Sequence, residues 1–459
     1  MYDYLISNGV LVFPSETFIA DIAVNNGKIV AIGNLDELVP AKEKFDASGK
    51  FIIPGLIDPH VHMKHPYKGI YASDNFFTTS VSAAYGGTTT IIDFAIQWDK
   101  SKKLSNIIHN RRIEIENDSV VDFGLHGTPT RSDEETINSV KKSLELGVTS
   151  FKVYMVYRDQ GRIVEDPVIF KLLKELKSYD ALLMVHAENC SMADYYRDHF
   201  LSLNKKGVHN FPDTKPDFVE AEAINRIIFL NRLASSRLYI VHLSTQMGLE
   251  IINSAQNLNE EIYAETCPHY LLLNREVYEQ DNGKNFLCSP PLRTNDDCKA
   301  LWKGLADGKI SVISSDHCGF NLMQKNMGND DFSMTPNGLP GAETRLPLIY
   351  TEGVLQHRIS LQQMVSVLSV NAAKIFNLYP QKGCLLPGSD ADFCVFDIND
   401  EWIIKAKDLH GAVDWSPYEG MRVKGRVIAT MLRGTFIVKN GSLMVDNGFG
   451  KFIYRTTKN

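Results

Sequence analysis

Apolar residues follow two different spacings along this chain, and the spacing changes near both ends. In the first 50 residues, short apolar runs alternate with turn residues, and the Asn-Gly pairs at 8–9 and 26–27 indicate β-hairpins. The same pattern returns after about residue 386, where Gly and Asn separate short β-rich runs. We therefore expect both ends to consist of strands and to share one small sheet domain.

Between these ends, short apolar runs rich in β-formers alternate with segments of helical period. The segments 166–180 and 218–235 place apolar residues at i, i+3, i+4 and i+7, as an amphipathic helix that covers a sheet requires. Repeated βα units of this kind predict an α/β fold, a (β/α)8 barrel of the TIM type. The eight predicted strands are 55–62, 88–94, 121–127, 149–154, 182–187, 237–243, 262–266 and 310–316.

The two patterns of apolar residues divide the chain into two expected structural units. Residues 54–385 would form the barrel, and residues 1–53 and 386–459 would together form a small β-sandwich domain. A length of 459 residues suits a barrel with an accessory unit of this size.

Charge and cysteine content narrow the possible surroundings and partners. The formal net charge of −7, with scattered Lys and Arg, predicts no nucleic-acid partner and no anionic membrane partner. The sequence contains no run of about 18 apolar residues and no signal-peptide pattern at its start. Seven cysteines without a CxxC pair predict free thiols in a reducing compartment. We expect a cytoplasmic protein.

Side chains that can bind metals stand at the carboxyl ends of the predicted strands, where such barrels carry their chemistry. One HxH pair alone is more often two hydrogen-bonded histidines than a metal pair. A histidine that ends an apolar run can likewise be a hydrogen-bonded core residue. The recurrence of such residues at one rim of the barrel favours a shared metal site. These residues are His60, His62, His186, His242 and Asp316.

Lys152 lies inside the apolar run SFKVYM, where an uncompensated ammonium is costly. A lysine that extends its amine to water is the alternative, but the interior of a barrel offers little water. We therefore expect a depressed pKa and covalent modification. Carboxylation by carbon dioxide would give a carbamate that can bridge two cations.

Twelve ordered motifs cover nearly the whole chain, and together they resemble the amidohydrolase superfamily. SPYEG and the tyrosine five residues after Lys152 make the chain similar to the dihydropyrimidinase and hydantoinase group of cyclic amidases. The motifs are PGLIDPHVH (54–62), AAYGGTTTIIDF (83–94), SFKVYMVY (150–157), MVHAEN (184–189), YIVHLS (239–244), ETCPHYL (265–271), SPPLR (289–293), SSDH (314–317), PNGLPGAETR (336–345), NAAKIF (371–376), GSDADFCVFD (388–397) and SPYEG (416–420).

The resemblance implies a role for each site residue. One divalent ion, usually zinc, would be held by His60, His62 and Asp316, a second by His186 and His242, and carboxylated Lys152 would bridge both. Manganese or cobalt would also suit these ligands. Asp316 would move the proton between the attacking water and the leaving nitrogen, and Tyr157 would stabilise the oxyanion. The main chain of Ser289 and Asn337 would bind the imide edge of the substrate.

The implied activity is hydrolysis of a small cyclic amide, a dihydropyrimidine or a 5-substituted hydantoin, to an N-carbamoyl amino acid by a homotetramer. Allantoinase and dihydroorotase share the metal site and remain alternatives. The dihydroorotase pattern HxHxR has Lys64 here in place of the arginine, which loses the bidentate fork. A non-catalytic scaffold of the same fold is the alternative of another class, although every ligand position is filled. Glu188, His269 and His317 are candidate supports of the ligands or ordinary structural residues.

Overall fold

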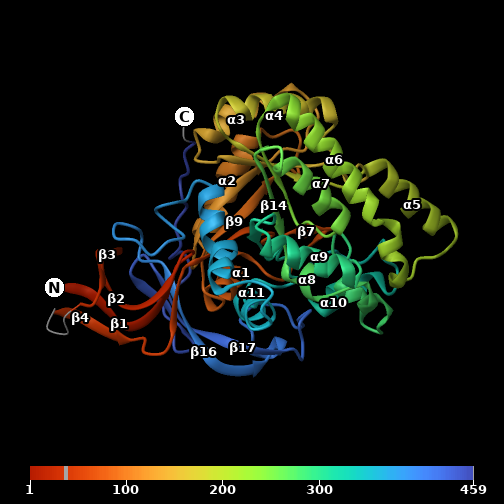
Figure 1. Ribbon diagram of the computed structural model, residues 1–459. Helices are drawn as coiled ribbons and strands as arrows, with labels where there is room; N and C mark the ends of the chain where they lie inside the picture. The colour runs from red at the N-terminus through yellow and green to blue at the C-terminus, as the bar shows by residue number, and fades with distance from the viewer. Residues whose placement is uncertain (36–39, 458–459) are drawn as a thin grey trace.

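The computed structural model describes residues 1–35 and 40–457. Its centre is a sheet around which the helices lie (Figure 1). This sheet has eight parallel strands in the order β15-β14-β13-β12-β11-β10-β9-β6. Each strand lies within, or within two residues of, one of the eight predicted apolar runs. The strands are β6 (Leu56–Val61), β9 (Thr88–Ile96), β10 (Asp122–Thr128), β11 (Ser150–Tyr154), β12 (Leu182–His186), β13 (Arg237–Ile240), β14 (Ile262–Thr266) and β15 (Val312–Ile313).

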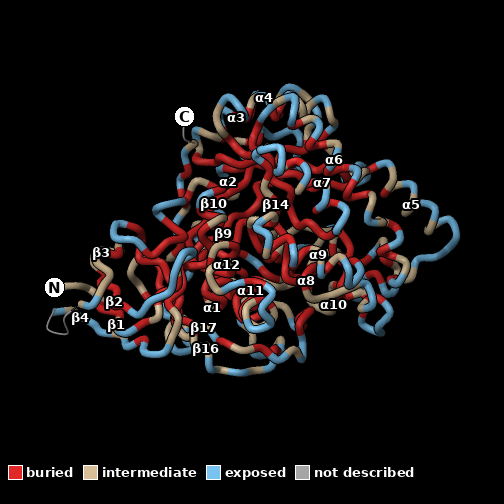
Figure 2. The backbone as a smooth tube through the Cα atoms, in the orientation of Figure 1, coloured by how far each residue is buried: buried red, intermediate tan, exposed pale blue. Residues whose placement is uncertain are grey.

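The first and last strands of this sheet meet, which closes it into a barrel. Val61 forms a parallel bridge with His317, and the His62 amide donates to the His317 carbonyl at 2.8 Å. Almost every residue of the barrel strands is buried (Figure 2), because side chains fill the interior and helices cover the outside. The predicted (β/α)8 barrel is confirmed.

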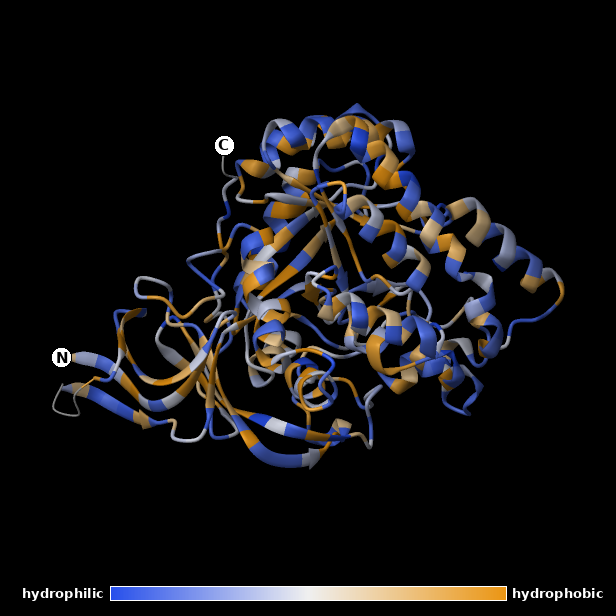
Figure 3. Cartoon of the chain, in the orientation of Figure 1, coloured by the Kyte–Doolittle hydropathy of each residue, from blue (hydrophilic) through white to orange (hydrophobic). Residues whose placement is uncertain are grey.

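Amphipathic helices pack around the barrel as the helical spacing predicted. Helix α4 (Asp166–Ser178) buries Ile169, Leu172, Leu173 and Leu176 and packs on β12. Figure 3 shows apolar strands at the centre and polar residues on the outer helices. The other helices are α1 (Phe76–Tyr85), α2 (Leu104–Glu116), α3 (Glu134–Leu144), α5 (Cys190–Ser202), α6 (Asp217–Ala234), α7 (Gln246–Gln256), α8 (Pro268–Leu272), α9 (Asn295–Ala306), α10 (Leu322–Lys325), α11 (Arg345–Ile349), α12 (Leu361–Val365) and α13 (Asn371–Ile375).

Both ends of the chain join in a second, nine-stranded sheet. Its order is β19-β18-β17-β16-β5-β1-β2-β3, and β4 pairs with β1. N-terminal β5 runs antiparallel to C-terminal β16, with Ile53 opposite Cys394. The strands are β1 (Tyr2–Val12), β2 (Thr17–Asn25), β3 (Lys28–Gly33), β4 (Ala41–Asp46), β5 (Phe51–Pro54), β16 (Phe393–Ile403), β17 (Arg422–Leu432), β18 (Thr435–Lys439) and β19 (Ser442–Leu443).

This terminal sheet folds over onto itself around its own apolar core. The ring of Phe436 in β18 lies 5.3 Å from that of Tyr4 in β1 and 5.2 Å from that of Phe45 in β4. Three strands separate β18 from β1 in the order of the sheet, so these contacts join two facing layers. The expected sandwich of N- and C-terminal strands is therefore present. Its division from the barrel after residues 53 and 385 stays a prediction.

A buried charge cluster joins the barrel to the terminal sheet. The ammonium of Lys382 lies 2.5 Å from Asp122, 3.0 Å from Asp390 and 2.7 Å from Asp392, and Arg433 also contacts Asp122. Asp122 begins β10, so the cluster lies at the amino ends of the barrel strands. The carboxylates are close enough together to bind a cation, but Lys382 already supplies the positive charge.

The cysteines and the helices were also the subject of predictions from the sequence. All seven cysteines are buried and free, as the sequence predicted. Among the described residues, we find no helix whose length and apolar character would let it cross a membrane.

Candidate metal centre

Three of the predicted ligands converge at the carboxyl ends of the first and last strands. The carboxylate of Asp316 lies 3.1 Å from Nε2 of His60 and 3.3 Å from Nε2 of His62, and the two imidazole nitrogens are 3.2 Å apart. These three ligand atoms are close enough together to hold one ion. Period-two alternation along β6 brings both imidazoles to the same side, as the HxH spacing predicted.

The other three predicted ligands lie beside the first group. His186 ends β12 and His242 follows β13, and Nδ1 of the former is 2.9 Å from Nε2 of the latter. Lys152 lies within β11, and its amine is 3.0 Å from Nε2 of His60. The rings of His60 and His242 are 5.4 Å apart, so the two groups form one cluster.

A cavity of about 90 Å3 opens onto this cluster, and all but one of the predicted site residues line it. Only His60 is absent from its wall, because that residue is completely buried beneath it. The predicted site residues that line the cavity are His62, Lys152, Tyr157, His186, His242, Ser289, Asp316 and Asn337.

Burial leaves the imidazoles neutral, which is the form that binds metal ions. Desolvation lowers the pKa of His60 to about 3 and that of His186 to about 4, and it also holds the pKa of His62 and His242 well below the usual value. Each ring therefore keeps a lone pair at neutral pH. Neutral imidazoles beside a carboxylate make a donor set that suits divalent cations such as zinc.

Lys152 is buried, and none of the described residues forms an ion pair with it. Burial lowers the pKa of its amine to about 8, and the amine lies 4.3 Å from the centre of the Phe94 ring. Within residues 1–35 and 40–457, no carboxylate oxygen comes within 4 Å of it. A partly neutral amine at this position can react with carbon dioxide, because only the unprotonated form is nucleophilic.

The backbone takes an unusual conformation at three residues of the site. Asp316, His242 and Tyr157 have φ values of 47°, 39° and 66°, in the left-handed region. Such conformations cost about 1 to 3 kcal/mol each and persist where the surroundings enforce them. They turn these side chains into the cavity just after the strands end. Nothing in the sequence signals them.

Glu265, a buried acid of β14 that was not among the predicted site residues, orients two of the histidines. Its carboxylate contacts Nδ1 of His60, accepts from the Tyr239 hydroxyl at 2.8 Å, and accepts from the His242 amide at 3.2 Å. Burial raises the pKa of Glu265 to about 7. A partner on Nδ1 leaves Nε2 of His60 free to act as a ligand. An acidic residue within the apolar run 262–266 was the available signal.

Glu188 supports the ligand His186, which was one of its two predicted roles; the other was an ordinary structural role. Its carboxylate lies 2.6 Å from Nε2 of His186 and 2.8 Å from the amine of Lys215. Burial alone would raise the pKa of Glu188, but the charge of Lys215 and the hydrogen bond from His186 hold it well below the usual value. Lys215 also donates to the Ser289 hydroxyl at 2.6 Å, so it links the histidine support to the predicted substrate loop.

The other two candidate supports, His317 and His269, contact none of the predicted metal ligands through the ring atoms described below. Nε2 of His317 lies 3.1 Å from Asp74, and its Nδ1 accepts from the Gly341 amide at 3.1 Å, so this ring fastens loops together. His269 is buried, and its Nε2 has no hydrogen-bond partner among the described residues. Neither lines the metal cavity.

Lys325 ties together the two loops that carry Ser289 and Asn337. This buried ammonium donates to the Leu287 carbonyl at 3.2 Å and to the Pro336 carbonyl at 2.8 Å. Burial lowers its pKa to about 7. No sequence signal marked this residue, because its partners come from loops that only the fold brings together.

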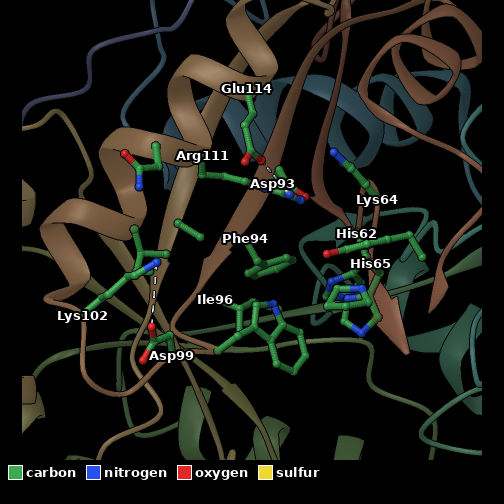
Figure 4. A pocket seen from close by; sticks show the side chains of 16 residues that line it. His62, Lys64, His65, Asp93, Phe94, Ile96, Asp99, Lys102, Arg111 and Glu114 are labelled. Carbon is green, nitrogen blue, oxygen red and sulfur yellow. Dashed lines mark hydrogen bonds and ion pairs between the residues drawn. The ribbon is translucent and has the colours of Figure 1, made fainter. Parts of the chain in front are cut away.

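A second cavity of about 430 Å3 lies beside His62 (Figure 4). Arg111 binds Asp93 at 2.6 Å and the Met63 carbonyl at 2.5 Å, which fixes the chain just after the HxH pair. The amine of Lys64 lies over the rings of Tyr71 and Phe76, 5.7 and 5.5 Å from their centres. Lys64 is not in the wall of the metal cavity, unlike a residue that would bind a substrate carboxylate there.

Comparisons with known proteins agree with this geometry. The sequence model of the amidohydrolase family matches residues 51–437. The chain is 37% identical to the D-hydantoinase of Geobacillus stearothermophilus, over 98% of this chain and 96% of that protein. It is 37% identical to the D-hydantoinase of Ralstonia pickettii, over 99% of each. The crystal structure of dihydropyrimidinase from Brevibacillus agri superposes with a TM-score of 0.96 at 37% identity, over 99% of each chain. The chain therefore belongs to the amidohydrolase family and, within it, to the dihydropyrimidinase and hydantoinase group.

Proposed function

We propose that this protein is a metal-dependent hydrolase that opens the ring of dihydropyrimidines or 5-substituted hydantoins to give N-carbamoyl amino acids. The observation that carries the proposal is the convergence of six ligand-type side chains, five of which line one cavity together with Tyr157, Ser289 and Asn337. The names of the similar proteins point to the same class of substrate.

The donor set supports two divalent cations, for which we propose zinc. His60, His62 and Asp316 would hold one, and His186 and His242 the other, with Lys152 between the two groups as a carbamate. Two cations so held would supply an activated water at neutral pH and would polarise the ring carbonyl.

The residues of this protein then have three tasks. Asp316 takes the proton of the attacking water and gives it to the ring nitrogen as the carbon–nitrogen bond breaks. The phenol of Tyr157 donates to the oxyanion, and burial raises its pKa, so that it stays protonated. The main chain of Ser289 and Asn337 binds the imide edge and holds the carbonyl in place.

The function is tested by turnover. Purified protein, supplied with zinc and bicarbonate, is incubated with dihydrouracil and with hydantoins, and N-carbamoyl products are measured by liquid chromatography. Dihydroorotate and allantoin in parallel test the two alternative activities. Ring opening of the first two classes supports the proposal. No product with metal and carbon dioxide supplied contradicts it.

The bridge is tested with Lys152→Ala. The variant should lose metal, measured by plasma mass spectrometry, and activity, and a short carboxylic acid such as propionate should restore part of both. Lys64→Ala is the matched control, because Lys64 is on a neighbouring loop but outside the metal cavity. It should keep its metal. Full metal content in Lys152→Ala would refute the bridging role.

The seven free cysteines support a reducing, cytoplasmic location. The homotetramer stays a prediction of the family resemblance, and analytical ultracentrifugation would test it.

A further inference from the structure

Arg162 lies where the metal cavity opens to the outside. It is in the wall of that cavity and also in the wall of a mouth cavity of about 660 Å3, which shares Tyr157 and Asn337 with the metal cavity. Its guanidinium carbon lies 4.8 Å from the ring centre of Tyr157, 4.9 Å from that of Trp98 and 5.5 Å from that of Tyr154. Aromatic faces therefore surround a cation that faces the path of a substrate.

Among the described residues, this guanidinium has no anionic partner within 4 Å, although the neighbouring arginines do. Arg197 lies 3.0 Å from Asp194, and Arg158 lies 3.7 Å from Glu165. In the part of the chain that the structure describes, no carboxylate comes within 4 Å of Arg162, whose side-chain partners are neutral, the amide oxygen of Gln160 and the hydroxyl of Tyr154. Its Nε is buried and makes no hydrogen bond. An unpaired donor of this kind costs free energy until a ligand satisfies it.

The backbone holds Arg162 in place before any ligand arrives. The Arg162 amide donates to the Tyr157 carbonyl at 3.0 Å, and the Val164 amide donates to the Tyr154 carbonyl at 2.9 Å. Gly161 turns the chain with a φ of 67°. The loop is thus fastened to the end of β11, and little ordering is needed on binding.

The other charges of the mouth cavity favour one anionic group. The acids in its wall, Asp159 and Asp194, both pair with Arg197. Lys215 pairs with Glu188, and Lys68 binds the Ser333 carbonyl at 3.1 Å. A guanidinium that has only neutral partners among the described residues and keeps an unpaired Nε–H matches a carboxylate, which has the same planar geometry.

We propose that Arg162 binds a carboxylate at the end of the ring substituent, so that the preferred substrates are cyclic ureides with an acidic side chain, such as 5-(carboxyalkyl)hydantoins. This inference rests on the proposed ring-opening function. With the ring in the metal cavity, a substituent that extends outward meets the guanidinium at the junction of the two cavities.

The experiment compares two substrates of nearly equal shape, 5-(2-carboxyethyl)hydantoin and its neutral amide, 5-(2-carbamoylethyl)hydantoin. The wild-type protein should have a kcat/KM for the acid about 10- to 100-fold above that for the amide, the range expected of hydrogen bonds to a charged group. Arg162→Gln should bring this ratio close to one. Arg158→Gln, which removes the same charge from the same loop but outside both cavities, should leave it unchanged.

Binding of both compounds to the zinc-loaded proteins, measured by calorimetry, separates this inference from the proposed function. Ring opening with no preference for the acid, or with a preference that survives in Arg162→Gln, overturns the carboxylate site alone. If neither ring opens, but the acid binds more tightly than the amide and only when Arg162 is present, the site stands and the ring-opening function fails. No ring opening and no Arg162-dependent binding overturns both.

Discussion

The buried ammonium of Lys382 should carry a large share of the stability of the protein. We consider Lys382→Met, which keeps the length of the side chain and removes its charge. The Lys382 side chain is 1% exposed, and the three carboxylates that it contacts are between 1% and 6% exposed. The variant would leave Asp390 and Asp392 buried without this partner, while Asp122 keeps Arg433.

The contacts set the size of the expected effect. Removing one partner of a buried ion pair typically costs about 3 to 5 kcal/mol, because the remaining charge is left in a poorly solvating interior. We expect a loss of this size in the free energy of unfolding. The cluster lies at the amino ends of the strands and the ligands at their carboxyl ends, so the metal content of the folded variant should not change.

Urea unfolding, followed by tryptophan fluorescence and checked for reversibility, measures the loss. Lys28→Met is the matched control, because Lys28 binds the same Asp390 at 2.6 Å but is 44% exposed. An exposed pair contributes about 1 kcal/mol or less, so the control should unfold near the wild-type midpoint. If the two variants unfold at the same urea concentration, burial of the charge is not what makes Lys382 stabilising, and the prediction is refuted.

Three further predictions concern residues around the site. Burial raises the pKa of Glu220 from 4.5 to about 7, so the unfolding free energy should fall as pH rises through this range, by on the order of 3 kcal/mol. Glu220→Gln should make this slope smaller in urea titrations between pH 5 and 8, where Glu265, whose pKa burial also raises to about 7, still contributes, and an unchanged slope would exclude Glu220 as a source. Lys325→Met should raise KM about 10-fold through the loss of two hydrogen bonds that hold the substrate loops, with metal content unchanged; a wild-type KM would contradict this. Tyr157→Phe should lower kcat about 100- to 1000-fold in steady-state assays while the metal stays bound, and a near-normal kcat would remove Tyr157 from oxyanion stabilisation.

Much of the site could be predicted because its residues follow local patterns. His60 and His62 alternate along one strand, and His186, His242 and Asp316 each come just after an apolar run. A parallel barrel brings the ends of all its strands to one rim, so local spacing was enough to bring these residues together. Lys152 was recognisable because a lysine within an apolar run is a conflict that the fold must resolve.

The supporting residues were harder to predict, because their partners are distant in sequence. Glu265 contacts His60 across 205 residues, and Lys382 binds Asp122 across 260. Lys215 looks like any surface lysine until η1 (Val208–Thr214) and the following turn bring it to Glu188. Neither the period of apolar residues nor residue type encodes such pairs.

The barrel, its helices and the six ligand candidates could be predicted from the sequence alone. The order of the apolar runs and the residues at their ends were sufficient, because periodicity and strand direction are local properties of the chain. Only the folded chain decided which charges are compensated. It placed Lys382 among three carboxylates and left Arg162 without one from any residue that the structure describes, although both are ordinary cations in the sequence. The physical reason is that the energy of a charge depends on its burial and its neighbours, which long-range packing sets.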